Sequence, residues 1–323
     1  MFPRVSIIIL NWNGWRDTIE CLESVYRITY PNYDVIVVDN GSKDNSIQKI
    51  KEYAEGKIKV HSKFFDYNPN NKPIRVFEVS EDDAKKGKFN RPLYEKFDVN
   101  RRMILIKNRD NYGFAGGNNV GIKFALSVLN PDYVMLLNND TVVDKKFLDE
   151  LVKVAESDKK IGIAGPLILY YDHPTIVWAF GTVALRGKPK SYILYTPIEV
   201  PWVIGCALLL KADLLRSVGL LDENIFLYGE EYDLCLRARS QSYYLYAVPT
   251  STVIHKEKMD YILDKPYKLY YELKHFPYVL RKNYMGANFA YVFLRYYLGG
   301  TILKKSLLIL KLLKNQKKEK CKR

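Results

Sequence analysis

Polar side chains that could bind a ligand follow four apolar runs of this 323-residue sequence, directly after each run ends. These polar segments are residues 11–14 (NWNG), 39–42 (DNGS), 108–111 (NRDN) and 138–141 (NNDT). In an open parallel sheet, ligands bind outside the carboxyl ends of the strands. One polar loop needs no ligand to explain it, but four apolar strands that all end in Asn or Asp favour a shared binding site.

The last of these segments offers oxygen ligands for a metal ion. Asn138, Asn139 and Asp140 combine amide oxygens with one carboxylate, a set that suits Mg²⁺ or Mn²⁺ held jointly with substrate phosphates. The alternative is that Asp140 only caps the helix that follows. His255, at the end of a β-rich run (STVIH), is a second candidate ligand and is equally compatible with a structural histidine.

Residues 111–121 (NYGFAGGNNVG) form a glycine-rich segment that leads into a predicted helix. Such a segment lets backbone N–H groups approach a phosphate. It lacks the G-x-G-x-x-G spacing of dinucleotide-binding proteins, it follows the third strand rather than the first, and it is not the G-x-x-x-x-G-K-[ST] loop. The sequence therefore argues against a nicotinamide-dependent enzyme and against a P-loop NTPase.

Two adjacent carboxylates, Glu230 and Glu231, stand at the start of another predicted helix (YGEEYDLCLR). A carboxylate in a binding site can act as general base toward a hydroxyl group. The two residues can also simply stabilise the helix, because acidic side chains are favourable near its amino-terminal end. Arg237, farther along the same segment, is expected to orient this helix rather than to contact a substrate.

An alternation of strands and helices positions these residues. Continuous β-branched apolar runs predict strands, helical periodicity predicts helices, and consecutive β-α units imply a parallel sheet. We expect strands at 5–10, 33–39, 102–108 and 133–137 and helices at 15–27, 44–53, 118–129 and 145–157. The second half predicts a mixed pattern, with strands at 161–169, 175–183 and 204–210 and near Leu245 and Thr252, and helices at 212–218 and 231–240. Residues 60–101 show little periodicity and are expected to form an insertion at the periphery of the sheet.

Five motifs in this order resemble the inverting glycosyltransferases of family 2, of GT-A fold, and in particular the branch that includes rhamnosyltransferases. They are VSIIILNWN, VIVVDNGSKD, NYGFAGGNNVG, LLNNDT and GEEYDLCLR, within about residues 3–255. The resemblance implies an α/β fold with a mostly parallel central sheet flanked by helices. It also implies transfer of a sugar from a nucleotide diphosphate sugar to a saccharide or a polyprenyl- or dolichyl-linked acceptor, with inversion and with Mg²⁺ or Mn²⁺. The alternative is a nucleotide-sugar-binding or nucleotidyltransferase-like protein that transfers no sugar.

The resemblance further implies roles for individual residues. Glu231 stands where the family has an aspartate and is implied as the general base, with Glu230 the other candidate. Asp140 is implied as a metal ligand, although Asn138 replaces the first carboxylate of the family's Asp-x-Asp motif. The leaving diphosphate needs positive charge, which the metal and His255 or a lysine within residues 256–258 would supply. The implied nucleotide-sugar-binding residues are Asn11, Asn13, Asp39, Asn111, Gly113, Gly117, Asn119, Asn138 and Asn139.

The excess positive charge is concentrated in the C-terminal region. Residues 256–323 hold seventeen Lys and Arg against five Asp and Glu, so they carry +12 of the +14 net charge of the chain. A nucleic-acid enzyme would spread its basic residues over its folded body, whereas a basic tail is attracted to an anionic membrane surface. We therefore expect no nucleic-acid partner, a catalytic domain at 1–257, and a basic, aromatic-rich helical extension at 258–323.

Two apolar segments of this extension could contact the membrane. Residues 284–302 have the length of a transmembrane helix but contain Arg295, Gly299 and Gly300, whereas residues 306–313 lie between lysine clusters and fit an interfacial amphipathic helix better. The alternative is that the tail packs on the catalytic domain or mediates oligomerisation. The four cysteines have no metal-ligand spacing and the N-terminus has no signal-peptide pattern. We expect a cytoplasmic protein that is peripheral at the cytoplasmic face of the cell membrane.

Overall fold

The computed structural model describes residues 2–183, 186–193, 195–257 and 266–284. The chain divides into two compact units, Met1–Met259 and Asp260–Arg323. Of the second unit, the structure describes helix α9 (Pro266–Asn283) and Tyr284. The two segments for which membrane contact is predicted, 284–302 and 306–313, lie outside the described residues apart from Tyr284. Within the described ranges, no helix is both long enough and apolar enough to cross a membrane.

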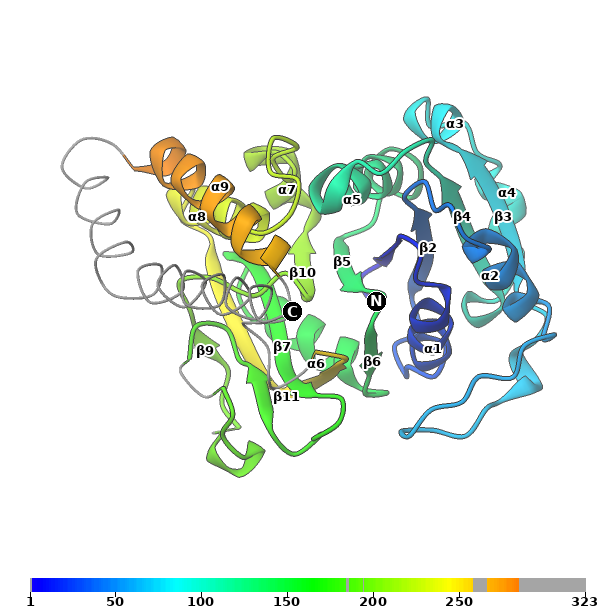
Figure 1. The fold of residues 1–323 in the computed structure, drawn as a ribbon, viewed down its shortest axis with the longest axis horizontal. Helices are drawn as coiled ribbons and strands as arrows, with labels where there is room; N and C mark the ends of the chain where they lie inside the picture. Colours follow the sequence, from blue (N-terminus) through cyan, green and yellow to red (C-terminus); the bar gives the residue numbers. More distant parts are fainter. Residues whose placement is uncertain (1, 184–185, 194, 258–265, 285–323) are drawn as a thin grey trace, which may run out of the picture. The chain divides into compact units, whose positions relative to one another are not determined.

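Five parallel strands form one half of the sheet in the first unit, in the spatial order β3-β4-β2-β1-β5 (Figure 1). They are β1 (Val5–Asn11), β2 (Tyr33–Asp39), β3 (Arg75–Ser80), β4 (Arg102–Lys107) and β5 (Tyr133–Asn138). All of β2 and nearly all of β1 is buried, because helices cover both faces of a parallel sheet. The parallel β-α order predicted from the sequence is confirmed.

The other half of the sheet is mixed, which is also confirmed. Its strands are β6 (Thr141–Val143), β7 (Ile161–Tyr170), β8 (Val177–Ala179), β9 (Ile198–Glu199), β10 (Ala207–Lys211) and β11 (Tyr244–His255). β10 lies antiparallel between β5 and β7, and β11 runs parallel to β7. β8 pairs with β7, β9 pairs with β11, and β6 pairs antiparallel with β11. The pairing of β11 with β6 brings the end of β11 to the loop that follows β5.

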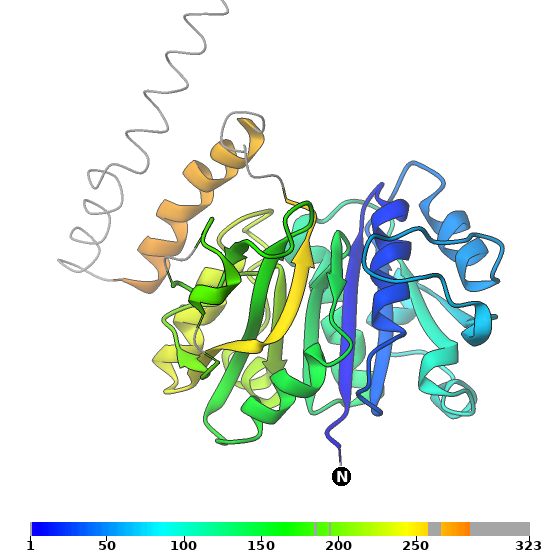
Figure 2. The same cartoon turned by 90° about the horizontal axis from the view of Figure 1, so that it is seen from below.

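Helices cover both faces of this sheet (Figures 1 and 2). They are α1 (Trp15–Val25), α2 (Ser46–Ala54), α3 (Glu81–Lys85), α4 (Arg91–Tyr94), α5 (Gly113–Phe124), α6 (Phe147–Ala155), α7 (Ala212–Val218) and α8 (Glu230–Ser240), with a π turn at Ala125–Leu129 and 3₁₀ turns at Pro69–Asn71, Val99–Arg101 and Lys190–Tyr192. Side chains of a strand alternate between the two faces. Ile7 and Ile9 therefore pack in one core with α1, α2 and α6, and Ile8 packs in the other with α5, α7 and α8.

Several predicted elements differ from the structure, among them the two strands expected near Leu245 and Thr252, which form the single strand β11. The 60–101 segment is peripheral as expected, but it contains β3, which forms the edge of the sheet beside β4, and the short helices α3 and α4. Only Val79 of β3 is buried, so the strand lacks the continuous apolar run of its neighbours. The helix predicted from residue 118 begins at Gly113, because the glycine-rich segment is itself helical. The strand predicted at 175–183 is confined to β8.

Gly113 begins helix α5 at a position that accommodates no side chain. Its φ is +71°, and a Cβ atom there would lie 2.3 Å from the carbonyl oxygen of Phe226. We expect Gly113→Ala to lower the free energy of unfolding by about 2 to 5 kcal/mol, the cost of a left-handed residue plus that of overpacking. Urea unfolding followed by circular dichroism measures this loss.

Gly187 provides the matched control. Its φ is +77°, but nothing lies within 4 Å of its Cβ position. Gly187→Ala should therefore lower the free energy of unfolding only by the cost of a left-handed residue, about 1 to 2 kcal/mol. Equal losses in the two variants would contradict the packing argument for Gly113.

Candidate functional site

Hydrogen bonds around Asp39 join the loops that follow β1 and β2. Asn11 Nδ2 donates to Asp39 Oδ1 over 2.7 Å, and the Ser42 hydroxyl donates to the same oxygen over 2.6 Å. The Ser42 backbone N–H donates to Asp39 Oδ2 over 3.1 Å. Asp39 is buried and forms no ion pair with the described residues, so neutral donors hold its carboxylate. A carboxylate oriented in this way can accept a further hydrogen bond from a nucleobase or a ribose hydroxyl.

Asn13 closes the same pair of loops from the β1 side. Its backbone N–H donates to Ser42 Oγ over 2.9 Å, and its side-chain oxygen accepts from the Lys43 N–H over 2.8 Å. Asn13 adopts a φ of +51° in doing so, a region that Asn occupies more readily than most residues. The structure therefore brings together Asn11, Asn13 and Asp39, the three residues predicted for the nucleoside.

Three asparagines link the loop after β2 to the loop after β4. Asn40 Nδ2 donates to Asn111 Oδ1 over 2.9 Å, and Asn108 Nδ2 donates to Asn40 Oδ1 over 3.1 Å. Asn111 Oδ1 also accepts from the Gly113 N–H over 2.9 Å. Of the three, only Asn111 is implied as an individual nucleotide-sugar-binding residue. Asn40 and Asn108 lie in the polar segments 39–42 and 108–111 that the sequence predicts at the shared site, without a role of their own.

Gly117 and Asn119 lie inside helix α5 and contact other parts of the protein. A Cβ atom at Gly117 would lie 2.6 Å from Leu10 Cδ1 and 2.9 Å from the Asn40 amide. Asn119 Nδ2 donates to the Leu221 carbonyl oxygen over 2.8 Å, and Asn119 Oδ1 accepts from the Leu221 N–H over 3.2 Å. These contacts fix α5 against the sheet and against the segment before α8. A role of the two residues in donor binding stays a prediction.

The residues after β5 contact two neighbouring elements. The Asn138 N–H donates to the Cys206 carbonyl oxygen over 2.9 Å. Asn139 Nδ2 donates to Thr18 Oγ1 over 3.0 Å and to the Gly14 carbonyl oxygen over 3.3 Å. Asn138 is thereby tied to the start of β10, and Asn139 to the first turn of α1.

Asp140, next in this loop, lies beside His255. Asp140 Oδ1 and His255 Nε2 are 3.2 Å apart, because the pairing of β11 with β6 places His255 opposite Thr141. Burial by itself raises the pKa of Asp140, but the charge and hydrogen bond of His255 outweigh it, so the pKa lies below its usual value. Both side chains are ligands for divalent cations. The described residues contain no group of three His, Cys, Asp or Glu side chains that could hold a metal by themselves.

Packing fixes the other side of the His255 ring. The indole of Trp178, on β8, meets the imidazole edge-on with ring centroids 4.6 Å apart. His255 Nδ1 is buried and has no hydrogen-bond partner within the described part of the chain. Asp140 is thus the polar group that orients the imidazole.

Lys256 forms its ion pairs with other carboxylates, although its charge also helps to lower the pKa of Asp140. Its ammonium nitrogen lies 2.6 Å from Asp17 Oδ1 and 2.5 Å from Glu20 Oε2, both on α1. Two carboxylates therefore already neutralise one of the lysines considered for the leaving diphosphate. Lys258, the other, lies outside the described residues.

Glu230 and Glu231 begin helix α8 in different surroundings. Glu230 is 4% exposed, and its Oε2 has no hydrogen-bond partner among the residues the structure describes. Burial, and then the neighbouring charge of Glu231, raise the pKa of Glu230 well above its usual value. Glu231 is partly exposed, and its Oε2 accepts from the Gly229 N–H over 3.3 Å. Burial therefore favours the neutral form of Glu230, and Glu231 is the more exposed carboxylate of the pair.

Gly205 connects Glu231 to the loop after β5. A Cβ atom at Gly205 would lie 3.4 Å from Glu231 Cβ, so the two residues are in contact. The next residue, Cys206, accepts the hydrogen bond from Asn138. Farther along α8, Arg237 donates to carbonyl oxygens of the segment between α7 and α8, in line with its expected role in orienting the helix. Glu231 thus lies at the same edge of the sheet as the Asp140 loop.

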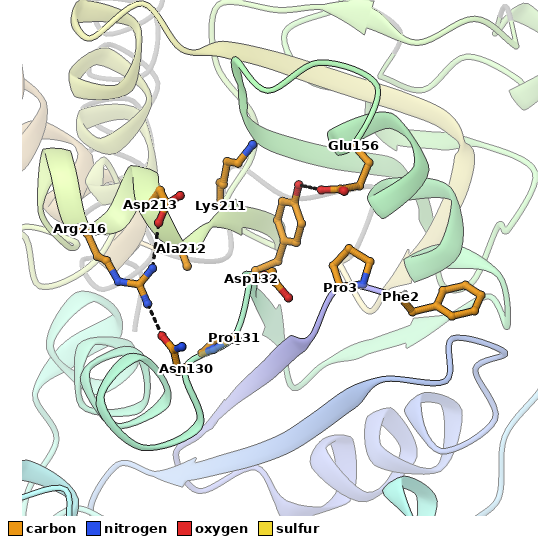
Figure 3. Close-up of a pocket in the computed structure, with 11 residues that line it drawn as sticks. Phe2, Pro3, Asn130, Pro131, Asp132, Glu156, Lys211, Ala212, Asp213 and Arg216 are labelled. Carbon is orange, nitrogen blue, oxygen red and sulfur yellow. Dashed lines mark hydrogen bonds and ion pairs between the residues drawn. The ribbon is translucent and has the colours of Figure 1, made fainter.

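A separate cavity of about 350 Å³ lies at the opposite edge of the sheet, where β1 and β5 begin (Figure 3). Several of its polar side chains pair with one another: Arg216 donates to Asp213 over 2.9 Å and to Asn130 over 2.8 Å, and the Tyr133 hydroxyl donates to Glu156 over 2.5 Å. None of the predicted site residues lines this cavity. The candidate site is therefore the edge formed by the carboxyl ends of β1, β2, β4 and β5.

Two family models match the chain. "Glycosyl transferase family 2" matches residues 6–72, and "Glycosyltransferase like family 2" matches residues 79–282. The chain is 26% identical over 181 residues to the low-salt glycan biosynthesis hexosyltransferase Agl10 of Haloferax volcanii, which covers 52% of this chain and 57% of that protein. It is 22% identical over 242 residues to the dTDP-rhamnosyl transferase RfbF of Shigella flexneri, with 70% and 81% covered. The chain thus spans little more than half the length of the first of these relatives.

Solved structures with the same architecture bind nucleotides. The mannosyltransferase PcManGT from Pyrobaculum calidifontis, in complex with GDP-Man and Mn²⁺, matches with a TM-score of 0.57 at 14% identity over 96% of this chain and 79% of that one. GalNAc-T7 with UDP, GalNAc and Mn²⁺ matches with a TM-score of 0.53 at 16% identity over 79% of this chain and 43% of that one. At these identities the likeness concerns the fold.

Proposed function

We propose that this chain, which belongs to glycosyltransferase family 2 and has the GT-A fold, transfers a sugar from a nucleotide diphosphate sugar to an acceptor hydroxyl with inversion at the anomeric carbon. One observation carries the proposal. Asp39, Asp140 and Glu231 come from three distant parts of the sequence, and all three lie at the carboxyl edge of the parallel strands. That edge is where ligands of open α/β sheets bind.

The donor nucleotide would bind where the loops after β1, β2 and β4 meet. The carboxylate of Asp39 would accept a hydrogen bond from the base or the ribose, and Asn11 and Ser42 hold that carboxylate in place. The Asn40, Asn108 and Asn111 cluster would keep the neighbouring loop at a fixed distance. Relatives that are named for dTDP-rhamnose and hexose transfer support a nucleotide sugar as the donor class.

Glu231 would act as the general base. Inversion in a single displacement needs one group that takes the proton from the acceptor hydroxyl as its oxygen attacks the anomeric carbon. Glu231 is partly exposed at the start of α8, whereas Glu230 is buried and its pKa is raised, which favours its neutral form. The proton would move from the acceptor oxygen to a Glu231 oxygen, while the bond between the anomeric carbon and the diphosphate breaks.

Asp140 and His255 would hold a divalent cation, Mg²⁺ or Mn²⁺. Their facing atoms are 3.2 Å apart, which suits two ligands of one cation, and a cation with few protein ligands completes its coordination with substrate phosphates and water. The bound cation would supply positive charge to the leaving diphosphate. Asn139 contributes to the same loop by fixing it to α1.

The acceptor would be a saccharide or a polyprenyl- or dolichyl-linked saccharide presented at a membrane. We propose that the basic C-terminal extension, with +12 of the net charge in residues 256–323, attracts the protein to the cytoplasmic face of the cell membrane. Binding to anionic vesicles that weakens as salt rises is the expected signature of this attraction. Binding that is insensitive to salt would contradict it.

A screen of nucleotide diphosphate sugars with Mn²⁺ and Mg²⁺ tests the activity. Nucleotide release reports slow hydrolysis or transfer, and the thermal unfolding midpoint of the same samples reports binding. We expect release above background with the donor that also raises the midpoint most. A donor that stabilises the protein without any turnover, across acceptors of both classes, would favour the alternative of a nucleotide-sugar-binding or nucleotidyltransferase-like protein.

A further inference from the structure

The segment between β8 and β9 carries two strongly exposed aromatic side chains among basic residues. Tyr192 is 66% exposed and Tyr195 is 79% exposed, the highest values among the large apolar side chains of the described residues. Residues 173–198 contain no Asp or Glu. We define the 186–195 patch as Arg186, Lys188, Lys190, Tyr192 and Tyr195.

Backbone hydrogen bonds hold the first part of this patch, residues 187–190, beside β8 at the edge of the sheet that carries the candidate site. The Val177 N–H donates to the Lys188 carbonyl oxygen over 2.9 Å, so the patch segment runs along β8. The next residue of β8 is Trp178, whose ring packs against His255. Figure 1 shows this segment beside β7 and β11. A membrane that binds at Lys188 would therefore lie near the loop that contains Asp140.

The composition of the patch matches the interface of a lipid bilayer. Tyrosine rings are favourable at the level of the lipid headgroups, where the ring is in an apolar environment and the hydroxyl meets water. Each Lys or Arg near an anionic surface strengthens binding by about fivefold. Tyrosines and cations can also bind single-stranded nucleic acid, but there the bases stack in a groove that follows the backbone. Rings that are two-thirds or more exposed fit a flat surface better.

We propose that the 186–195 patch docks the first unit of the protein on an anionic membrane, in addition to any contact made by the C-terminal extension. The proposal deepens the proposed function, because a lipid-linked acceptor would then approach the Asp140 and Glu231 edge from the membrane side. Docking itself is independent of chemistry. A protein that binds membranes through this patch but transfers no sugar would leave the docking proposal intact and contradict only the proposed function.

Sedimentation of the full chain with vesicles of phosphatidylglycerol and phosphatidylcholine tests the proposal. Every variant keeps the C-terminal extension, so its contribution cancels. We expect Lys188→Gln to weaken binding about fivefold on these anionic vesicles and to have no effect on pure phosphatidylcholine vesicles. We expect the double variant Tyr192→Ser/Tyr195→Ser to weaken binding on both, because apolar ring area is lost from the interface.

The matched control is the double variant Leu93→Ser/Tyr244→Ser. It removes two exposed apolar side chains, 41% and 37% exposed, from places away from the patch, and it should bind vesicles as the unsubstituted chain does. Thermal unfolding midpoints verify that all variants are folded. Patch variants that bind like the unsubstituted chain, a control that loses as much as they do, or a full chain that binds no vesicles would each overturn the proposal. Loss of oligouridylate binding in the patch variants with vesicle binding unchanged would overturn it in favour of nucleic acid.

Discussion

Replacing Glu231 by glutamine is expected to lower the turnover of sugar transfer by about 100-fold or more, with donor affinity nearly unchanged. Glutamine cannot take the proton from the attacking acceptor hydroxyl, so the loss appears in the transition state. The donor nucleotide would bind on the other side of the site, around Asp39, and would not need the Glu231 charge. Initial rates at saturating donor measure the turnover, and titration calorimetry with the nucleoside diphosphate measures the affinity.

Glu230→Gln is the matched control for this experiment. Glu230 is buried and its pKa is raised, which favours the neutral form, and glutamine resembles that neutral side chain in size and in its capacity to donate a hydrogen bond. We expect near-normal turnover. If Glu230→Gln loses turnover and Glu231→Gln retains it, the assignment of the base is wrong.

The parallel half of the sheet could be predicted because its strands are buried on both faces. β1 and β2 contain unbroken apolar runs, and the polar residue directly after each run marks the carboxyl end of the strand. The polar residues that follow the apolar runs therefore predict, without any long-range contact, that Asn11, Asp39 and Asp140 lie at one edge of the sheet. β3 escaped prediction because it is a half-exposed edge strand with one buried residue, Val79.

The partner of Asp140 could not be assigned from local sequence. Asp140 and His255 are 115 positions apart, and they meet because β11 returns to pair with the short strand β6. Strand pairing of this kind depends on tertiary packing, and the hydrophobic periodicity of the sequence does not predict it. The surroundings of Glu230 and Glu231 are equally non-local, since burial by other elements raises the pKa of one of two identical side chains.

The function of the glycine-rich segment 111–121 could not be predicted from the sequence for a different reason. Glycines before a helix can expose backbone N–H groups to a phosphate, or they can let a helix approach a sheet closely, and both require the same residues. In the structure, Gly117 contacts Leu10, and Gly121 contacts Ile8 and Val38 at positions where a Cβ atom would lie within 3 Å. These two glycines serve close packing of α5, which the spacing of glycines alone does not distinguish from phosphate binding.

Asp140→Asn is expected to abolish the part of nucleotide binding that depends on a divalent cation. A ligand at 100 times its dissociation constant adds about 2.7 kcal/mol to the free energy of unfolding. For the unsubstituted chain we expect nucleoside diphosphates to stabilise more with Mn²⁺ or Mg²⁺ than with a chelator. Asparagine keeps a side-chain oxygen beside His255 but lacks the negative charge that attracts the cation. Urea unfolding with UDP, GDP or dTDP, with and without the metal, measures the difference.

Two further variants make the outcome decisive. Asp213→Asn removes an equal charge from a side chain that is 74% exposed and pairs with Arg216 at the opposite edge of the sheet, so it should leave the metal-dependent gain unchanged. His255→Gln removes the second proposed ligand and should reduce the gain. A gain that survives Asp140→Asn but disappears in His255→Gln would assign the cation to the histidine alone. A gain that survives both substitutions would remove the cation from this edge of the sheet, because these are the two ligands proposed there.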